Sequence, residues 1–85
     1  MSYKLAIITP EGKVFDDAVD ELVASGQSGS FGVLQHHAPM LAGLKNGILK
    51  LKAQGQESLW MTSQGVLEIS KSGEVLILVD KADKQ

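Results

Sequence analysis

Short apolar runs recur along this chain of 85 residues, and glycine, asparagine, aspartate or serine separates them. The runs begin roughly every 8–12 residues, a spacing typical of an all-β sandwich or barrel. The pattern predicts strands at 4–9, 13–16, 18–24, 31–34, 48–53, 58–62, 66–70 and 75–79. The last run contains only valine, isoleucine and leucine, which is typical of a buried strand. We therefore expect a single antiparallel β-sandwich with little or no helix.

Turn residues mark the ends of several of these runs. The sequence Pro-Glu-Gly-Lys at 10–13 predicts a type II turn, 25–30 predicts a glycine- and serine-rich loop, and Gln54-Gly55-Gln56 predicts a hairpin. In the run 18–24 apolar and acidic residues share both faces, so the pattern leaves its orientation open. Only 39–44 contains good helix formers, and Gly43 would limit a helix there to about one turn.

Length, charge and composition narrow the class of protein. A chain of this length corresponds to one domain, residues 1–85. No apolar run approaches the roughly 20 residues of a membrane helix, and no signal-peptide pattern opens the sequence. The absence of cysteine excludes a disulfide framework and a thiolate metal site. A net charge of −2, with eight lysines and no arginine, argues against nucleic-acid binding.

The most informative stretch is 29–44, GSFGVLQHHAPMLAGL, whose composition is that of a recognition surface rather than of an ordinary hairpin. It resembles the signature of the epsilon subunit family of F-type ATP synthases, whose mitochondrial counterpart is called delta. The matching residues are Gly29, Phe31, Gly32, Val33, Leu34, His37, Ala38, Pro39, Met40 and Leu41. Gln35 and His36 stand where the family usually has Pro-Gly, so the local turn differs in sequence from the family pattern.

Three further motifs carry the same resemblance in the same order. They are KLAIITPEGKVF at 4–15, LKNGIL at 44–49 and SQGVLE at 63–68, so the resemblance covers nearly the whole chain. Members of the family usually carry a helical hairpin after the sandwich, and in this sequence it would begin near 81–85. In relatives that hairpin inhibits ATP hydrolysis and in some binds ATP. No residue of this chain is assigned to either activity.

The resemblance implies a non-catalytic subunit of the central stalk, without a cofactor, in a proton-translocating ATP synthase. The sandwich would clamp the gamma subunit to the ring of c subunits, so that both turn as one rotor. It would lie peripherally at the cytoplasmic face of a bacterial inner membrane, or at the organellar equivalent, without entering the bilayer. We place the c-ring contact at Ser28, Gly29, Ser30 and Phe31. We place the gamma-subunit contact at His37, Ala38, Pro39, Met40 and Leu41.

Two other classes of function remain open from the residues alone. A free-standing ligand- or metal-binding β-domain would use His36 and His37, although adjacent strand residues point to opposite faces and zinc needs three or four ligands. A hydrolase would use the paired carboxylates at 16–17 or 20–21, for which a solvated face is the simpler interpretation. No nucleophile elbow or phosphate-binding loop is present.

Two apolar features have competing interpretations. Met40 and Leu41 follow a rigid proline, and they fit either core packing or an exposed patch that docks a partner. Trp60 could anchor an interface, but its place within a predicted strand favours packing on the sandwich.

Overall fold

The computed structural model describes residues 2–85, which form ten strands and no helix. The strands are β1 (Tyr3–Thr9), β2 (Gly12–Val19), β3 (Glu21–Gly26), β4 (Gly29–Leu34), β5 (Met40–Leu44), β6 (Gly47–Ala53), β7 (Gln56–Thr62), β8 (Gly65–Ile69), β9 (Val75–Val79) and β10 (Ala82–Lys84). The predicted all-β class is confirmed.

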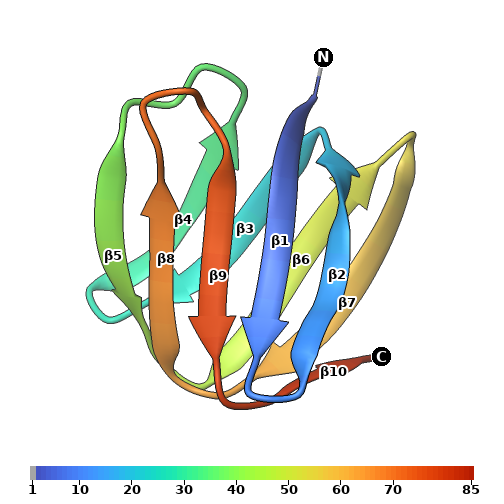
Figure 1. The fold of residues 1–85 in the computed structure, drawn as a ribbon, viewed down its shortest axis with the longest axis vertical. Helices are drawn as coiled ribbons and strands as arrows, with labels where there is room; N and C mark the ends of the chain where they lie inside the picture. Colours follow the sequence, from blue (N-terminus) through green and yellow to red (C-terminus); the bar gives the residue numbers. More distant parts are fainter. Residues whose placement is uncertain (1) are drawn as a thin grey trace.

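The strands build two layers that face each other (Figure 1). One layer has the order β5-β8-β9-β1-β2, and the other has the order β4-β3-β6-β7-β10. The layers meet where Gly26 of β3 pairs with Leu44 of β5. All neighbouring strands are antiparallel except β1 and β9, which run parallel, so the predicted antiparallel sandwich has one parallel pair.

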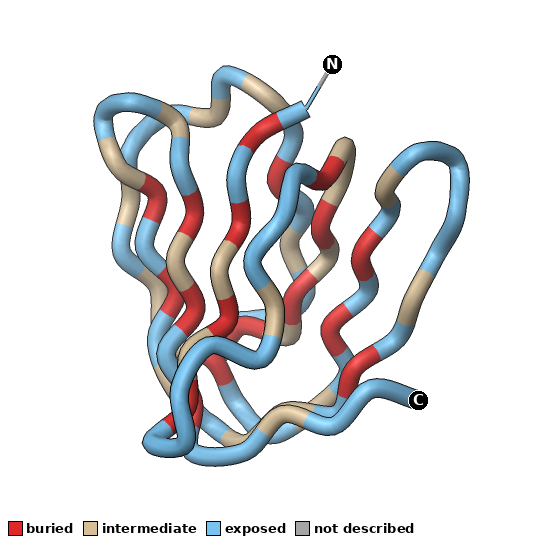
Figure 2. The backbone as a smooth tube through the Cα atoms, turned by 45° about the vertical axis from the view of Figure 1, so that its right-hand side comes forward, coloured by how far each residue is buried: buried red, intermediate tan, exposed pale blue. Residues whose placement is uncertain are grey.

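The core lies between the layers and is made by alternate residues of the strands (Figure 2). In β1, for example, Leu5 and Ile7 are fully buried while Lys4 is exposed. The opposite layer contributes Leu22, Leu49 and other aliphatic side chains. This period of two is what strand geometry requires when one face of a sheet is covered.

The predicted strand at 18–24 is wrong as a single element. The chain turns at Asp20, which leaves Val19 at the end of β2 in one layer and begins β3 in the other. The Asp20 backbone N–H donates to the Lys52 carbonyl at 2.7 Å, and its carboxylate accepts from the Gln54 backbone N–H at 3.0 Å. The corner shifts the alternation by one residue, which explains why the sequence pattern looked mixed.

Two local predictions also need correction, and one strand was missed. The helical turn considered at 39–44 is strand β5, since pairing with β8 overrides the helix propensity. The loop predicted at 25–30 shrinks to a two-residue turn between Gly26 and Gly29, and the short strand β10 was not predicted.

The turn after β1 differs from the predicted type II form. Pro10 and Glu11 form it, and it ends at the Thr9–Gly12 pair. Within residues 9–12 the only positive φ is that of Gly12 (119°), which follows the two turn residues, whereas a type II turn requires a positive φ at its third residue, here Glu11.

Candidate docking surfaces

The outer side of the layer that holds β1 carries an apolar surface, which we call the apolar face. It consists of Ala6, Ile8, Leu41, Val66, Leu76 and Leu78. Leu41 is 73% exposed, Leu78 45% and Val66 38%, while the other three are partly buried. A monomer seldom leaves so many large aliphatic side chains together on one sheet, and such a patch marks an interaction surface.

Strand register brings these residues together from four strands. Val66 of β8 pairs with Leu78 of β9, which pairs with Ile8 of β1, so the three side chains form one row. The neighbouring row runs from Leu41 through Glu68, Leu76 and Ala6. The prediction that 75–79 is a buried strand is therefore right for one face only.

The β3–β4 hairpin ends in the exposed pair Gln27-Ser28, which we call the hairpin tip. Gly29 follows with φ of 129°, a value that L-residues rarely adopt. Ser28, Gly29 and Ser30 are exposed and uncharged. The structure therefore presents three of the four residues predicted to contact the c-ring together at this tip.

Phe31, the fourth of these residues, is only partly exposed. Its ring covers Gly26, where an added Cβ would lie 2.8 Å from the Phe31 Cε1 atom, and it packs against the core. Phe31 thus holds the base of the hairpin, and a partner at the tip would meet mainly the three small residues before it.

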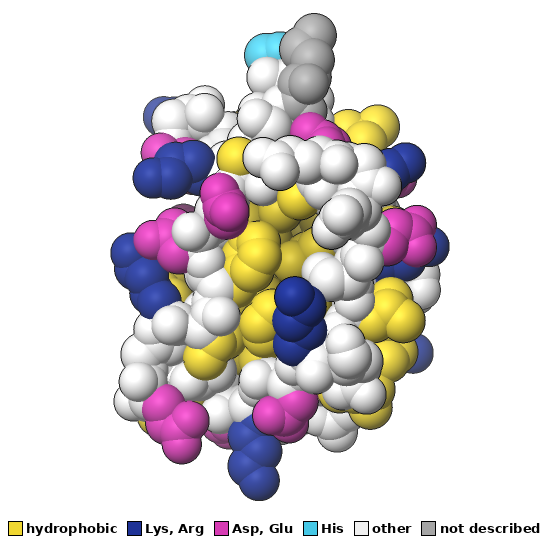
Figure 3. All heavy atoms as spheres, turned by 90° about the vertical axis from the view of Figure 1, so that its right-hand side faces the viewer, with side chains coloured by type: hydrophobic (Ala, Val, Ile, Leu, Met, Phe, Trp, Pro, Cys, Tyr) yellow, Lys and Arg dark blue, Asp and Glu magenta, His cyan; other side chains and the backbone are white. Residues whose placement is uncertain are grey.

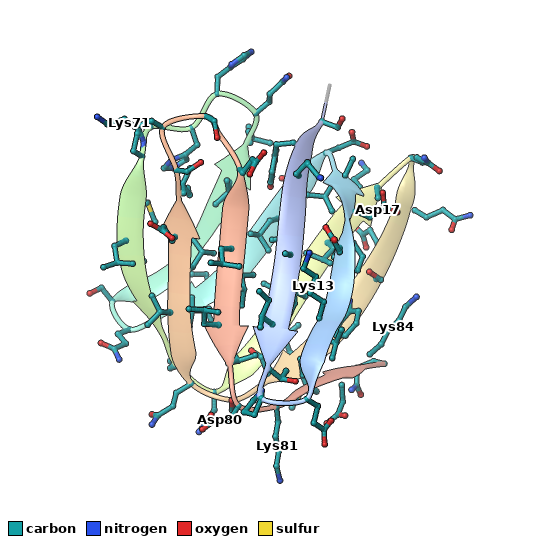
Figure 4. The ribbon with its side chains drawn as sticks, in the orientation of Figure 1. Lys13, Asp17, Lys71, Asp80, Lys81 and Lys84 are labelled. Atoms are coloured by element: carbon teal, nitrogen blue, oxygen red, sulfur yellow. The ribbon has the colours of Figure 1, made fainter. Side chains whose placement is uncertain are left out.

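A shallow hollow of about 630 Å³ joins the tip to the apolar face. Its lining includes Gln27 from the tip, Ile8, Val66 and Leu78 from the apolar face, and Asp80. In Figure 4, Asp80 lies at the end of the sandwich where β9 finishes. The polar tip and the apolar face are therefore continuous parts of one surface.

The histidine loop, residues 35–39, lies at the other end of β4 (Figure 1). The His37 backbone N–H donates to the Leu34 carbonyl at 3.2 Å, and His36 between them has φ of 67°. This is type II turn geometry, with Gln35 and His36 at the positions where proline and glycine are favoured. His36 is exposed, and the loop lines a second hollow of about 490 Å³ together with Lys71.

The residues predicted to contact gamma do not form one surface. His37, Ala38 and Pro39 lie in the histidine loop, and the His37 Nδ1 atom is 2.8 Å from the Ala38 carbonyl oxygen. Met40 is partly buried and packs against the core. Only Leu41 points outward on the apolar face. Of the two interpretations given above, core packing therefore applies to Met40, and the exposed patch applies to Leu41.

Sequence reasoning missed Ile8, Val66, Leu76 and Leu78 as surface residues. Residues 75–79 are apolar at every position, whereas a strand in a sheet with one solvated face usually alternates apolar and polar residues. This unbroken apolar run was the signal available in the sequence. Which residues would share that face depends on the register of four strands, which a single sequence does not specify.

The acidic residues considered for a hydrolase have local partners in the fold. Asp16 forms an ion pair with Lys13 at 3.1 Å, and Asp17 accepts a hydrogen bond from the Ala18 backbone N–H at 2.7 Å, so both carboxylates have local structural partners. Within residues 2–85, no group of three or more histidine, cysteine or acidic side chains is arranged to hold a metal ion. The same residues contain no helix with the length and apolar character needed to cross a bilayer.

Trp60 packs inside the sandwich, as predicted, and is 6% exposed. Its ring meets Phe15 edge to face, with centroids 6.0 Å apart. Phe15 belongs to β2 and Trp60 to β7, strands of opposite layers on the same side of the sandwich. Figure 3, which views this side, shows apolar side chains gathered in a depression.

Comparison with known proteins identifies the family. The family model for the β-sandwich domain of the ATP synthase delta/epsilon chain matches residues 2–85. The ATP synthase epsilon chain of Trichlorobacter lovleyi is 41% identical over 81 residues, 95% of this chain and 58% of its own length. The chloroplastic epsilon chain of Medicago sativa is 37% identical, with 99% of this chain and 61% of its own length covered. The chain thus spans about three fifths of these relatives.

Solved structures show the same fold. A chain in the mitochondrial ATP synthase of Euglena gracilis superposes with a TM-score of 0.92 over 98% of this chain and 53% of that one, at 21% identity. A chain in the central stalk and c-ring structure of Tetrahymena thermophila gives 0.81 over 96% and 66%, at 13% identity. Since the family model covers all described residues, this chain belongs to the ATP synthase delta/epsilon chain β-sandwich family.

Proposed function

We propose that this chain is a non-catalytic rotor subunit in the central stalk of a proton-translocating F-type ATP synthase. It would couple the gamma subunit to the ring of c subunits, peripherally to the membrane and without a cofactor. The relatives that carry the name epsilon chain support the assignment to this enzyme. The observation that carries the mechanism is the continuity of the apolar face with the uncharged hairpin tip on one rigid body.

Coupling two parts of a rotor needs two binding surfaces and little deformation between them. The apolar face, including Leu41, would bind gamma, because burying aliphatic side chains supplies affinity without directional partners. The hairpin tip would meet the c-ring, because Ser28, Gly29 and Ser30 let polar loops approach the backbone closely. The close-packed core between the layers would transmit torque from one surface to the other.

The gamma contact is tested with a matched pair of variants. Leu78→Asp alters the apolar face, and Met61→Asp alters the opposite layer, where Met61 is equally exposed at 45%. We expect Leu78→Asp to weaken binding to purified gamma subunit at least about tenfold, since a buried unpaired charge is costly at an interface. Met61→Asp should bind like the wild type. Circular dichroism checks that both variants are folded, and calorimetry measures their affinity for gamma. An equal loss of affinity in both variants would contradict this assignment.

Met40→Asp is less suitable as a test, because Met40 packs against the core and the substitution would destabilise the fold. Leu41→Asp is a better second variant, since Leu41 is 73% exposed. If the apolar face binds gamma, Leu41→Asp should reduce affinity while leaving the urea midpoint close to that of the wild type.

The ring contact is tested separately at the hairpin tip. Ser28→Trp places a bulky ring where the backbone is exposed, and it should abolish capture of the chain by c-rings in detergent. Binding to gamma should be unchanged, because Ser28 is not part of the apolar face. Normal capture of Ser28→Trp would show that the tip does not face the ring.

A further inference from the structure

The edge strand β4 pairs with β3 on one side and with no described strand on the other. A free strand edge offers unpaired N–H and C=O groups to another chain, and proteins usually protect such edges with charges, proline, bulges or short length. The other edge strands of the two layers, β2, β5 and β10, carry such protective features. β4, whose sequence is GSFGVL, contains none of them.

Each of the other three edge strands, β2, β10 and β5, has a feature that protects its free edge. β2 carries Lys13 and Asp17 (Figure 4) and a register shift opposite Ile7 and Ile8. β10 has three residues, of which two are charged. β5 follows a proline, and its pairing with β3 closes one end of its free edge.

The hydrogen bonds of β3 determine which β4 groups are free. The Lys45 N–H donates to the Ser25 carbonyl at 3.0 Å, and the Gln27 N–H donates to the Gly43 carbonyl at 3.2 Å. Backbone polar groups alternate along a strand, so Ala24 and Gly26 point theirs toward β4.

The β4 partners of Ala24 and Gly26 are Phe31 and Gly29, whose polar groups are therefore used within the sheet. By the same alternation, Ser30, Gly32 and Leu34 direct their N–H and C=O groups away from β3. All three residues are exposed, and the Leu34 side chain is 59% exposed. The Leu34 carbonyl already accepts the His37 N–H, but a carbonyl oxygen can accept a second bond.

We propose that β4 pairs with β4 of a second copy of this chain, antiparallel and about a two-fold axis at Gly32. This register alone uses all three free residues, because Gly32 faces its own copy and Ser30 faces Leu34. On the outer side Leu34 covers the small Ser30 of the other copy. On the core side Phe31 faces Val33, which covers the exposed part of the Phe31 ring.

Charge does not oppose this contact. β4 itself carries no charge, and the nearest charged residue on the same outer face is Glu21, which pairs with Leu34. Because the two strands run in opposite directions, the two Glu21 residues lie at opposite ends of the contact. The joined layers then form one continuous sheet through both copies, a symmetric arrangement that closes as a dimer.

The dimer would compete with rotor assembly if the proposed function holds. Ser30 belongs to both the proposed ring contact and the dimer contact, so one copy cannot use it for both. The self-pairing itself does not depend on the rotor function, and it is tested on the chain alone, without gamma or c-rings.

Gly32→Cys provides a direct test, because the natural chain has no cysteine and an added Cβ would have only the Leu22 carbonyl nearby, at 3.7 Å. In the proposed register the two cysteines face each other about 5.5 Å apart between Cα atoms, within the range of a disulfide. Mild oxidation should therefore link Gly32→Cys into dimers. Lys50→Cys, exposed on the central strand β6, is the control and should stay monomeric. Equal crosslinking of both variants would overturn the proposal.

Equilibrium sedimentation gives an independent readout without oxidation. The wild-type mass should rise from 9.1 kDa toward twice that value between about 10 µM and about 1 mM. Gly32→Lys places two like charges at the axis and should weaken association at least about tenfold, while Ile48→Lys on β6 should associate like the wild type. A wild type that stays monomeric throughout, or a folded Gly32→Lys that associates equally well, would overturn the proposal.

Discussion

The turn after β4 contains an L-residue in a conformation that favours glycine. His36 has φ of 67°, and the left-handed region costs an L-residue about 1–2 kcal/mol. We expect His36→Gly to raise the free energy of unfolding by about 1 kcal/mol, net of the greater freedom that glycine has in the unfolded chain. Urea denaturation measures this, with His36→Ala as the control that keeps the strain. A gain of the same size in His36→Ala would show that the backbone is not its source.

Tyr3 joins the two layers through one buried hydrogen bond. Its hydroxyl donates to the Val33 carbonyl at 2.7 Å, so Tyr3→Phe should lower the free energy of unfolding by about 1 kcal/mol near neutral pH. Urea denaturation of both proteins at pH 7 measures the difference. An unchanged free energy of unfolding would mean that this hydrogen bond contributes nothing to stability, because water satisfies the Val33 carbonyl equally well in Tyr3→Phe.

The same hydroxyl makes stability depend on alkaline pH. Burial, and then the nearby charges of Glu21 and Asp20, raise the pKa of Tyr3 above its ordinary value. The folded state therefore keeps this proton when the unfolded chain releases it, so stability is retained below about pH 10 and lost as the pH rises further. The free energy of unfolding should fall more steeply above pH 10 for the wild type than for Tyr3→Phe. Parallel curves would contradict this.

At the scale of the element, the pairing of β8 with β9 depends on a missing side chain. A Cβ at Gly65 would overlap the carbonyl oxygen of Leu78, whereas a Cβ at Gly32 would meet nothing closer than 3.7 Å. Gly65→Ala should therefore destabilise the fold by at least about 2 kcal/mol, and Gly32→Ala should change stability by less than about 1 kcal/mol. Thermal unfolding of the two variants compares them. Similar losses would mean that β8 can shift to accept the methyl group.

The elements that sequence analysis predicted correctly are those whose signal is local. Strand β9 and the β6–β7 hairpin have apolar alternation bounded by turn residues, and both were predicted within a few residues. The corner at Asp20 was not predictable, because it depends on hydrogen bonds to Lys52 and Gln54 more than 30 residues away. The strand at 40–44 was also missed as a strand, because its pairing with β8, rather than its own propensity, decides its conformation.

At the scale of the whole molecule, the candidate site was only partly predictable. The tip residues Ser28 to Ser30 follow from a local motif, and the structure presents them together. Leu41 was singled out, but Leu76 and Leu78 on the same face were not, since only the cross-strand register of β5, β8 and β9 places them on that face. Surfaces built from one segment can be inferred from a sequence, whereas those built from several strands need the fold.

Metal binding distinguishes the rotor proposal from the alternative of a small metal-binding domain. His36 is exposed, and His37 has its Nδ1 atom beside the Ala38 carbonyl oxygen, so the two rings do not share a third ligand within the described residues. Titration with zinc at neutral pH should give no tight binding, and chelator treatment should leave the unfolding temperature unchanged. A stoichiometric zinc complex lost in His36→Ala would support the alternative.

The parallel pairing of β1 with β9 has a consequence for how the chain acquires its structure. Leu5 pairs with Val75, so the first strand of the chain depends on nearly the last one. During synthesis the β1–β2 hairpin can form early, yet one side of β1 stays open until residues 75–79 have left the ribosome. Contacts between distant parts of a chain form slowly, so we expect refolding in milliseconds to seconds, limited by this closure. The nascent chain therefore leaves one edge of β1 unpaired until residues 75–79 emerge, and during that interval it most needs protection from aggregation.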